Sequence, residues 1–351
     1  MKGNLREAIQ TDLGMIFDWR NKQEVRDVSF HNNKITSEEH ALWWASATND
    51  PLLEILIYEW KGNPVGVVTF KYDSDKMINA RWSFYIGNAV EPGVGNRMCQ
   101  AAIEYAFFYK DLHDITGEVI SLNERSSNLH LKLGFVEVKK LSGSYIRGGK
   151  KYDVLYFTLQ NVLFSETLLK QMELYNITLR PLKVADIDEE YISWYSNRDG
   201  HLNHFTGSRR AFNQQSILDD YYQGSRTGKW FYYLIETSGG EKIGNVKVGL
   251  IDTINMTSDL VCLVGNRKFA GKGLAKKSIK VANQIAFSNH YIRRLQGGMY
   301  ADHIASYKAY TGAGWKEEVR FKGYYWVDGK AVDRICVSCL NPKYFEVDVN
   351  D

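Results

Sequence analysis

The sequence Ala-Gly-Lys-Gly-Leu-Ala at residues 270–275 decides how the rest of the chain is interpreted. An apolar run at residues 260–264 precedes it and predicts a buried strand. Residues 276–287 follow it and carry apolar and small side chains at helical spacing, which predicts a helix. Such a loop turns several backbone N–H groups towards one point at the helix N-terminus. Because these groups have no partner within the helix, and the helix dipole adds positive potential, we expect a polyphosphate to bind there.

A second motif lies downstream of this loop. It reads His303-x-x-Ser306-x-x-x-Tyr310-x-x-x-Gly314-Trp315. Together the two motifs resemble those of the GNAT N-acetyltransferases, which are Gln/Arg-x-x-Gly-x-Gly/Ala and Asn-x-x-Ser-x-x-x-Tyr-x-x-x-Gly-Phe. Ala270 stands where the family has Gln or Arg, so one side chain is lost at the start of the loop while every backbone donor remains.

The same features occur a second time, earlier in the chain. Leu5 corresponds to Leu179 near the start of each copy, and His130 corresponds to Tyr310 near its end. The spacing between counterparts stays nearly constant, at about half the chain. This period is far too long for a solenoid, so each copy is expected to be a whole domain. We therefore expect a first domain at residues 1–160, a linker at 161–175 whose apolar residues suggest a packed helix, and a second domain at 176–351.

The resemblance implies an α/β (α+β) fold with two tandem GNAT domains. Each would have a mixed central sheet, flanked by helices, in which two neighbouring strands splay apart. In the first copy the sequence predicts a helix at residues 12–21 and a second helix capped by Ser37. It also predicts strands at residues 53–58, 65–70, 82–86 and 118–122, and a hairpin around Gly148 and Gly149.

Composition excludes several other classes of protein. The 351 residues carry 44 Lys and Arg against 41 Asp and Glu, which argues against a dedicated nucleic-acid binder. No signal peptide or membrane span is expected, and a cytoplasmic location follows as the expectation. Four cysteines in so long a chain do not suggest a disulfide scaffold, and Cys336 and Cys339 are expected to be core residues rather than metal ligands.

Acetyl-CoA is the co-substrate that the resemblance implies, with no metal. The resemblance implies that its pantetheine arm lies along a strand edge at Phe84, Tyr85 and Ile86, or at Leu263 and Val264. It implies that the pyrophosphate rests on Gly93, Val94, Gly95 and Asn96, or on Gly271, Lys272, Gly273, Leu274 and Ala275. In the second motif it implies contacts from Asn123, Ser126, His303 and Ser306.

Three residues are candidates for proton transfer. Tyr310 stands where the family has its general acid, and the alternative is a buried tyrosine that bonds a backbone carbonyl. His130 is its counterpart, which could donate a proton or simply lie on the surface of a short helix. Glu118 could accept the proton of the amine, or could be a carboxylate at the rim that pairs with a lysine. The second copy has Gly298 at that position, and Asp302 is a weak substitute.

The first copy also resembles acetyltransferases of pseudaminic and other nonulosonic acid biosynthesis, which acetylate a UDP-linked 4-amino-4,6-dideoxy sugar. The residues that carry this resemblance include Trp19-Arg20-Asn21, Glu38-Glu39-His40 and Trp43-Trp44. The second copy resembles the RimJ/RimL-like branch, whose acceptors vary. The substrate-binding residues expected are Trp19, Arg20, Asn21, His40, Trp43 and Trp194. The tryptophans could instead be the inner faces of two amphipathic helices.

We therefore expect an N-acetyltransferase that acts on an amino group of a nucleotide-linked amino sugar, by direct attack of the amine on the thioester. The alternatives are acetylation of a protein N-terminus, a lysine or an antibiotic. A further alternative is one active copy beside a copy that only binds CoA or has a structural role. The expected partner is a small molecule rather than nucleic acid or a membrane, and a homodimer is left open.

Overall fold

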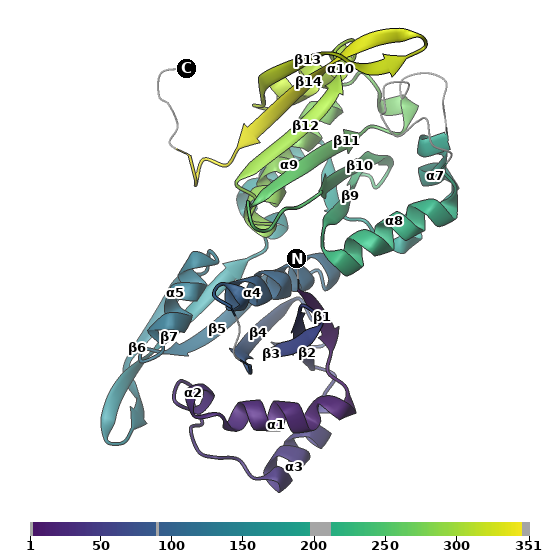
Figure 1. Ribbon diagram of the computed structural model, residues 1–351. Coiled ribbons are helices and arrows are strands. Elements are labelled where there is room, and N and C mark those ends of the chain that lie inside the picture. The colour runs from purple at the N-terminus through teal and green to yellow at the C-terminus, as the bar shows by residue number, and fades with distance from the viewer. Residues whose placement is uncertain (1–2, 89–90, 197–211, 346–351) are drawn as a thin grey trace. The chain divides into compact units, whose positions relative to one another are not determined.

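The computed structural model describes residues 3–88, 91–196 and 212–345 (Figure 1). The chain divides into two compact units, Met1–Asn161 and Val162–Asp351. Each unit contains one mixed sheet of seven strands with flanking helices, which confirms the expected fold class. Among the described residues, no helix is both long and apolar enough to cross a membrane.

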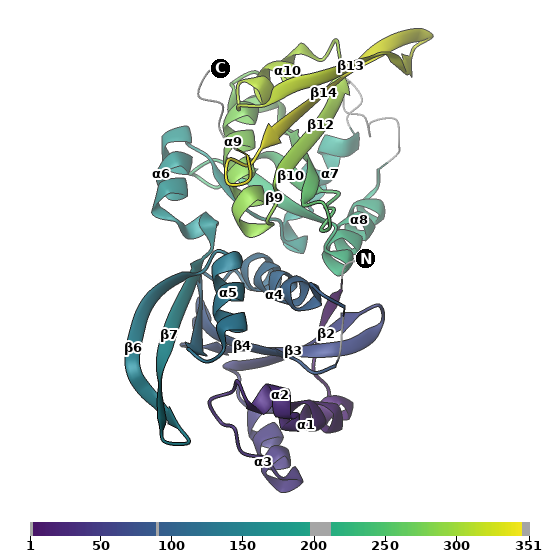
Figure 2. The ribbon, with the colours of Figure 1, turned by 60° about the vertical axis from the view of Figure 1, so that its left-hand side comes forward.

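The N-terminal unit builds its sheet in the strand order β1-β2-β3-β4-β5-β7-β6. Its strands are β1 (Asn4–Glu7), β2 (Leu53–Trp60), β3 (Asn63–Tyr72), β4 (Asn79–Ile86), β5 (Asp114–Ile120), β6 (Val136–Arg147) and β7 (Lys150–Gln160). Its helices are α1 (Leu13–Asn21), α2 (Gln23–Arg26), α3 (Ser37–Thr48), α4 (Val94–Glu104) and α5 (Glu124–Lys132). Figures 1 and 2 show α1, α2 and α3 on one face of this sheet and α4 on the other.

Two sequence predictions for this unit can be checked in detail. The cap of α3 is Thr36 rather than Ser37: Thr36 Oγ1 accepts a hydrogen bond from Glu39 N at 3.2 Å, and Glu39 Oε2 accepts one from Thr36 N at 2.8 Å. This reciprocal pair is a capping box, and it satisfies two backbone donors at once. The hairpin around Gly148 and Gly149 is confirmed, with both glycines at positive φ between β6 and β7.

The C-terminal unit repeats the same order, β8-β9-β10-β11-β12-β14-β13. Its strands are β8 (Thr178–Pro181), β9 (Trp230–Glu236), β10 (Lys242–Gly249), β11 (Thr257–Leu263), β12 (Arg294–Tyr300), β13 (Lys316–Val327) and β14 (Lys330–Leu340). Its helices are α6 (Glu166–Tyr175), α7 (Glu189–Ser196), α8 (Gln214–Thr227), α9 (Leu274–Asn289) and α10 (Ile304–Thr311). Helix α6 lies within the segment expected to be a helical linker, and Gln284 of α9 bonds Gln171 of α6.

A tryptophan closes the end of the same strand in each unit. Trp19 is 3% exposed and packs on Gly87, directly after β4, while Trp194 is 5% exposed and packs on Gly265, shortly after β11. A Cβ added at Gly87 would lie 1.9 Å from the Trp19 ring, and one added at Gly265 would lie 2.2 Å from the Trp194 ring. Only glycine therefore lets the indole lie flat on the backbone at these two positions.

Candidate active site

Two neighbouring parallel strands separate part-way along their length in both units. In the C-terminal unit, β11 and β12 pair only from Thr257 with Arg294 to Asp259 with Gln296, although β11 runs on to Leu263 and β12 to Tyr300. In the N-terminal unit, β4 and β5 likewise pair only at residues 79–81 with 114–116. The splayed strands expected from the sequence are therefore present in both copies.

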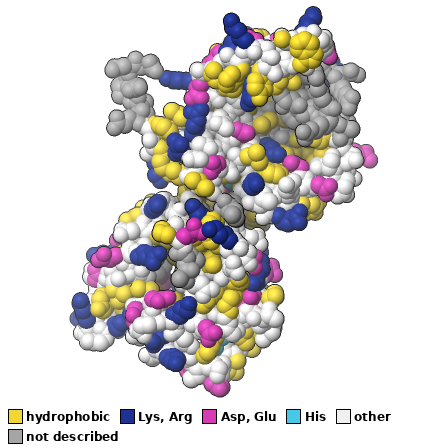
Figure 3. Space-filling model, viewed as in Figure 1, with side chains coloured by type: hydrophobic (Ala, Val, Ile, Leu, Met, Phe, Trp, Pro, Cys, Tyr) yellow, Lys and Arg dark blue, Asp and Glu magenta, His cyan; other side chains and the backbone are white. Residues whose placement is uncertain are grey.

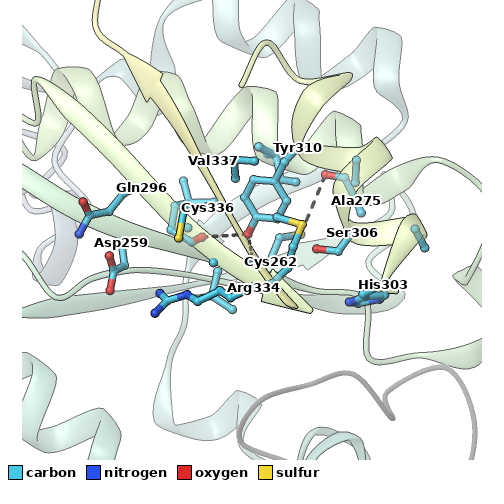
Figure 4. A pocket seen from close by; sticks show the side chains of 18 of the residues that line it. Asp259, Cys262, Ala275, Gln296, His303, Ser306, Tyr310, Arg334, Cys336 and Val337 are labelled. Atoms are coloured by element: carbon cyan, nitrogen blue, oxygen red, sulfur yellow. Dashed lines mark hydrogen bonds between the residues drawn. The ribbon is translucent and has the colours of Figure 1, made fainter. Parts of the chain in front are cut away.

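A cavity of about 780 Å³ fills the gap of the C-terminal unit (Figure 4). Several residues that the sequence singled out line it: Leu263, Val264, Gly271, Ala275, His303, Ser306 and Tyr310. Cys262, at the start of the expected strand edge, lines it too, whereas Asp259, Gln296 and Arg334 were not foreseen. The strand edge, the glycine loop and the second motif thus meet around one space.

The glycine loop leaves the first turn of α9 open. Gly273 is the N-cap of this helix at φ +73°, with no side chain bonded to the cap, and Gly271 lies at φ +72°. A Cβ built at either glycine would have no other atom within 4 Å, so there is open space above the loop. In the N-terminal unit Gly93 caps α4 in the same way, at φ +89°. Uncapped N–H groups facing open space fit a diphosphate.

Tyr310 is 7% exposed and bridges backbone groups of β11 at the gap. Its hydroxyl donates a hydrogen bond to Leu260 O at 2.8 Å and accepts one from Cys262 N at 3.3 Å (Figure 4). Burial raises the pKa of the Tyr310 phenol well above its usual value. The phenol therefore keeps its proton at neutral pH, as a proton donor must. It also bonds a backbone carbonyl, as a buried tyrosine with only a structural role would.

Asp259 is the carboxylate at the point where the strands part. It belongs to the last pair of the β11–β12 ladder, opposite Gln296, and it lines the cavity. Burial raises the pKa of its carboxyl above the usual range of aspartate. A raised pKa makes a carboxylate a better acceptor for an ammonium proton. The sequence prediction did not include Asp259, because it placed the carboxylate on the strand that is β12 in this unit, at the position of Gly298.

His130 is buried in the N-terminal unit rather than on the surface of α5. It is 2% exposed, its Nδ1 lies 2.8 Å from Ser126 O, and its Nε2 lies 3.1 Å from Trp82 Nε1. Because the indole can only donate, Nε2 accepts and Nδ1 carries the proton. Burial lowers the pKa of His130. A neutral ring with both nitrogens bonded within the chain favours a structural role.

Glu118 lies on β5 and forms an ion pair with Arg81 of β4, with 3.1 Å between Oε1 and Nη1. Its partner is thus an arginine on the facing strand rather than the lysine considered from the sequence. Arg81 belongs to the last pair of the β4–β5 ladder, as Asp259 does in the β11–β12 ladder. The two units therefore carry opposite charges on the strand that leads into the glycine loop.

Side chains around the gap are smaller in the C-terminal unit. Trp82, Phe84 and Phe157 of the N-terminal unit correspond to Leu260, Cys262 and Val337. In the N-terminal unit these aromatic rings surround His130, with ring centroids 4.9 to 5.7 Å from its own. The smaller residues of the C-terminal unit leave the space that forms its cavity.

The sequence matches the acetyltransferase (GNAT) domain family twice, at residues 4–136 and 176–316. The chain belongs to the GNAT acetyltransferase family. This confirms the expected enzyme class, an acetyltransferase with two tandem GNAT domains, and acetyl-CoA as its co-substrate.

Two solved structures that are similar to this chain each match less than half of it. A spermidine N-acetyltransferase from Vibrio cholerae, in complex with CoA and spermine, is 20% identical with a TM-score of 0.42; the match covers 45% of this chain and 95% of that one. A ribosomal-protein-alanine N-acetyltransferase from Brucella melitensis is 21% identical with a TM-score of 0.39, covering 44% and 98%. No curated protein matches the sequence.

The remaining residues expected to contact acetyl-CoA lie on the following strands and helices of the two units. Phe84, Tyr85 and Ile86 form the end of β4; Val94, Gly95 and Asn96 form the first turn of α4; Lys272 and Leu274 flank the cap of α9. Asn123 caps α5, because its side chain accepts a hydrogen bond from Ser126 N at 3.1 Å. Among the described residues, no group of His, Cys, Asp or Glu could hold a metal ion.

The residues expected to bind the acceptor have two kinds of environment. Trp19 and Trp194 are buried, and Asn21 bonds both the N–H and the carbonyl of Ile35, so these three hold the fold together. Arg20 and His40 differ, since Arg20 Nη1 and His40 Nε2 are buried without a hydrogen-bond partner among the described residues.

Arg20 and His40 are close enough to influence each other. Burial and the charge of Arg20 lower the pKa of His40, and burial lowers the pKa of Arg20 itself. Trp43 is 39% exposed, and its ring centroid is 5.1 Å from that of His40. Arg20 also acts electrostatically on Tyr85, near the end of β4.

Proposed function

We propose that this protein transfers acetyl from acetyl-CoA to an amino group of a nucleotide-linked amino sugar, a precursor of a surface polysaccharide or flagellar glycan. The observation that carries the chemistry is the gap of the C-terminal unit, where Asp259 and Tyr310 line one cavity between parted strands.

Binding of the coenzyme and the two proton transfers would fall to different groups of the C-terminal unit. When bound, acetyl-CoA supplies the acetyl group as a reactive thioester. Backbone N–H groups at the start of α9 would hold its diphosphate, and the free edge of β11 would hold its arm. Asp259 would take a proton from the ammonium group of the acceptor and so produce the amine that attacks. Tyr310 Oη, which lies against β11, would supply a proton to the CoA thiolate that leaves as the amine attacks.

The nature of the acceptor is supported by the N-terminal unit. Arg20 Nη1 and His40 Nε2 are buried without partners among the described residues, and a buried polar group without a hydrogen bond is costly. An oxygen-rich anionic ligand such as a diphosphate would satisfy both groups, and a guanidinium suits it best. The exposed face of Trp43 would suit a sugar or a base. Both features agree with the resemblance to nonulosonic acid acetyltransferases.

Release of thiol from acetyl-CoA tests this proposal, over UDP-linked amino sugars, peptides and aminoglycosides. We expect turnover with the UDP-amino sugars, and we expect Asp259→Asn to lower kcat by roughly 10² to 10⁴-fold. Asn keeps the size of the side chain and removes only its capacity to accept a proton. Turnover with peptides alone would refute the sugar assignment, and an Asp259→Asn variant of unchanged kcat would refute the role of Asp259.

A second candidate is that only the C-terminal unit transfers acetyl while the N-terminal unit binds ligands. The neutral, fully bonded ring of His130 and the Arg81–Glu118 ion pair favour it. His130→Ala and Glu118→Gln would then leave turnover unchanged. Calorimetric titration with acetyl-CoA adds an independent result: two sites per chain would keep both units as candidates for catalysis, and one site would identify a silent unit.

A further inference from the structure

We propose that the acceptor of the C-terminal unit carries an anionic group besides its amine, and that Arg334 binds that group. This inference rests on the proposed function, since it concerns the acceptor of the same gap. It is carried by a guanidinium that lines the cavity, has a buried polar atom without a partner among the described residues, and fills a space made available by a missing side chain.

Arg334 reaches the gap from β14 because Gly298 has no side chain. In the antiparallel β12–β14 ladder Arg334 pairs with Tyr300, and its side chain runs back over Gly298. A Cβ at Gly298 would lie 2.4 Å from Arg334 Nε and 2.5 Å from Nη2. The corresponding residue of the N-terminal unit is Glu118, whose carboxylate pairs with Arg81. A guanidinium therefore replaces a carboxylate at this point of the gap.

The surroundings of Arg334 orient it without neutralising it. Its guanidinium carbon is 4.9 Å from the centre of the Tyr324 ring, a cation–π contact. Tyr324 is on β13, where Phe321 and Trp326 are also exposed. Figure 3 shows hydrophobic side chains exposed on the surface of this molecule. Arg334 Nε is buried without a hydrogen-bond partner in the part of the chain that the structure describes. A buried N–H without a hydrogen bond has a free-energy cost. This cost would remain if Arg334 had only a structural role, whereas a bound anion would accept the hydrogen bond and remove it.

Asp259 also lines this cavity, as do Arg294 and Glu318, which form an ion pair with each other. The Arg334 guanidinium stabilises the ionised Asp259 carboxyl through space, and no ion pair joins their side chains among the contacts of the described residues. Figure 4 shows both groups in the cavity, with Asp259 on β11 beside the gap and Arg334 reaching it from β14. An amine that also carries an anion matches this pair, with its ammonium at Asp259 and its anion at Arg334.

The N-terminal unit presents the same pair of charges in exchanged places. Arg81 replaces Asp259 on the strand before the glycine loop, Glu118 replaces the guanidinium over Gly298, and the two form a direct ion pair at 3.1 Å. In that ion pair each charge already has a partner of opposite sign within the chain. The anion site formed by Arg334 is thus specific to the C-terminal unit, and the two units are expected to differ in the acceptors that they bind.

The anion could be a phosphate, as in a nucleotide-linked sugar, or a carboxylate, as in an amino acid. Two matched pairs of amines separate these sources: glucosamine 6-phosphate with glucosamine, and methionine with methionine amide. Each pair would be titrated calorimetrically into the full chain saturated with CoA, and tested as acceptors in the thiol-release assay. Binding does not depend on turnover, so a failure of the proposed catalytic roles would not obscure the result.

We expect at least one anionic amine to bind more tightly than its neutral partner. Arg334→Met should weaken that binding by about tenfold to hundredfold, the range for lost charge-assisted hydrogen bonds, and should not affect the neutral amine. Gly298→Ala should act in the same direction, since its Cβ displaces the guanidinium. Arg320→Met is the matched control, because Arg320 is exposed on β13 and pairs with Glu317.

Two results would overturn the inference. One is that neither anionic amine binds more tightly than its neutral partner. The other is that Arg334→Met weakens the anionic and the neutral amine equally, which would mean that Arg334 only supports the shape of the cavity. A preference for the phosphate over the carboxylate would favour a phosphorylated or nucleotide-linked sugar, and the reverse preference would favour an amino acid.

Discussion

Replacing Tyr310 with phenylalanine separates two roles that the structure gives to one hydroxyl group. The hydroxyl donates to Leu260 O at 2.8 Å and accepts from Cys262 N at 3.3 Å. Tyr310→Phe keeps the ring, its packing on Trp315 and its burial, and removes only these two hydrogen bonds. Any change in stability can therefore be assigned to the backbone groups, and any change in rate to the lost proton.

The size of each effect can be estimated. Leaving a buried carbonyl and a buried N–H without a partner costs about 1 to 3 kcal/mol. In a domain of this size, each kcal/mol shifts Tm by roughly 2 to 4 °C, so calorimetry should record a fall of about 2 to 12 °C for the C-terminal unit. Loss of a general acid lowers kcat by roughly 10² to 10⁴-fold, which thiol release measures.

Tyr307→Phe is the matched control for this experiment. Tyr307 lies one turn earlier on α10, and its hydroxyl bonds Glu317 instead of β11. We expect it to leave both Tm and kcat nearly unchanged. A Tyr310→Phe protein with the expected fall in Tm and an unaltered kcat would refute the role as acid. Unaltered Tm would show that the two hydrogen bonds contribute nothing to stability.

Two further predictions concern stability. Gly265→Ala should destabilise the C-terminal unit by about 1 to 3 kcal/mol, because its Cβ would lie 2.2 Å from the Trp194 ring. Gly14→Ala in α1 should instead stabilise the protein by roughly 0.5 to 1 kcal/mol, because a Cβ there meets nothing within 4 Å. Urea unfolding measures both changes. Asp12→Asn should cost about 1 to 3 kcal/mol, because it removes hydrogen bonds with the charged Arg6. These bonds hold the pKa of the Asp12 carboxyl below its usual range. The stabilisation is therefore present above the unfolded-state pKa of about 3.9 and is lost as pH falls through the lower folded-state pKa. If Asp12→Asn lowered the free energy of unfolding by the same amount at every acidic pH, this explanation would be wrong.

The sequence predicted best the features that depend on the backbone. Gly93 and Gly273 were identified from the glycine loop and its repeat, and the structure places both at φ near +70° to +90° at the start of a helix, where few side chains are allowed. The repeated architecture followed from spacing alone, since a repeat that takes up half of the chain is long enough for a whole domain and far too long for one unit of a solenoid. Cavity size, in contrast, depends on which side chains face each other across a sheet, and single positions along the chain do not report this.

The polar residues of the site were harder to predict. Asp259 is one acidic residue in a strand that otherwise looks like core, and its importance comes from lying opposite Gln296 where the ladder ends. Arg334 matters because Gly298, on another strand, lacks a side chain. For His130 the two options considered were a proton donor and a surface residue, and neither includes a ring that bonds an indole.

The tryptophan on a glycine at the end of β4, and again after β11, means that neither gap has to be opened by its ligand. A flat indole clamped on the chain directly after the strand fixes the direction in which the strand leaves the sheet, before anything binds. Acetyl-CoA then binds to a preformed gap, and none of its binding free energy is needed to separate the two strands. Loosening the clamp, as in Gly265→Ala, should therefore weaken coenzyme binding from a distance, without touching a single group that contacts it.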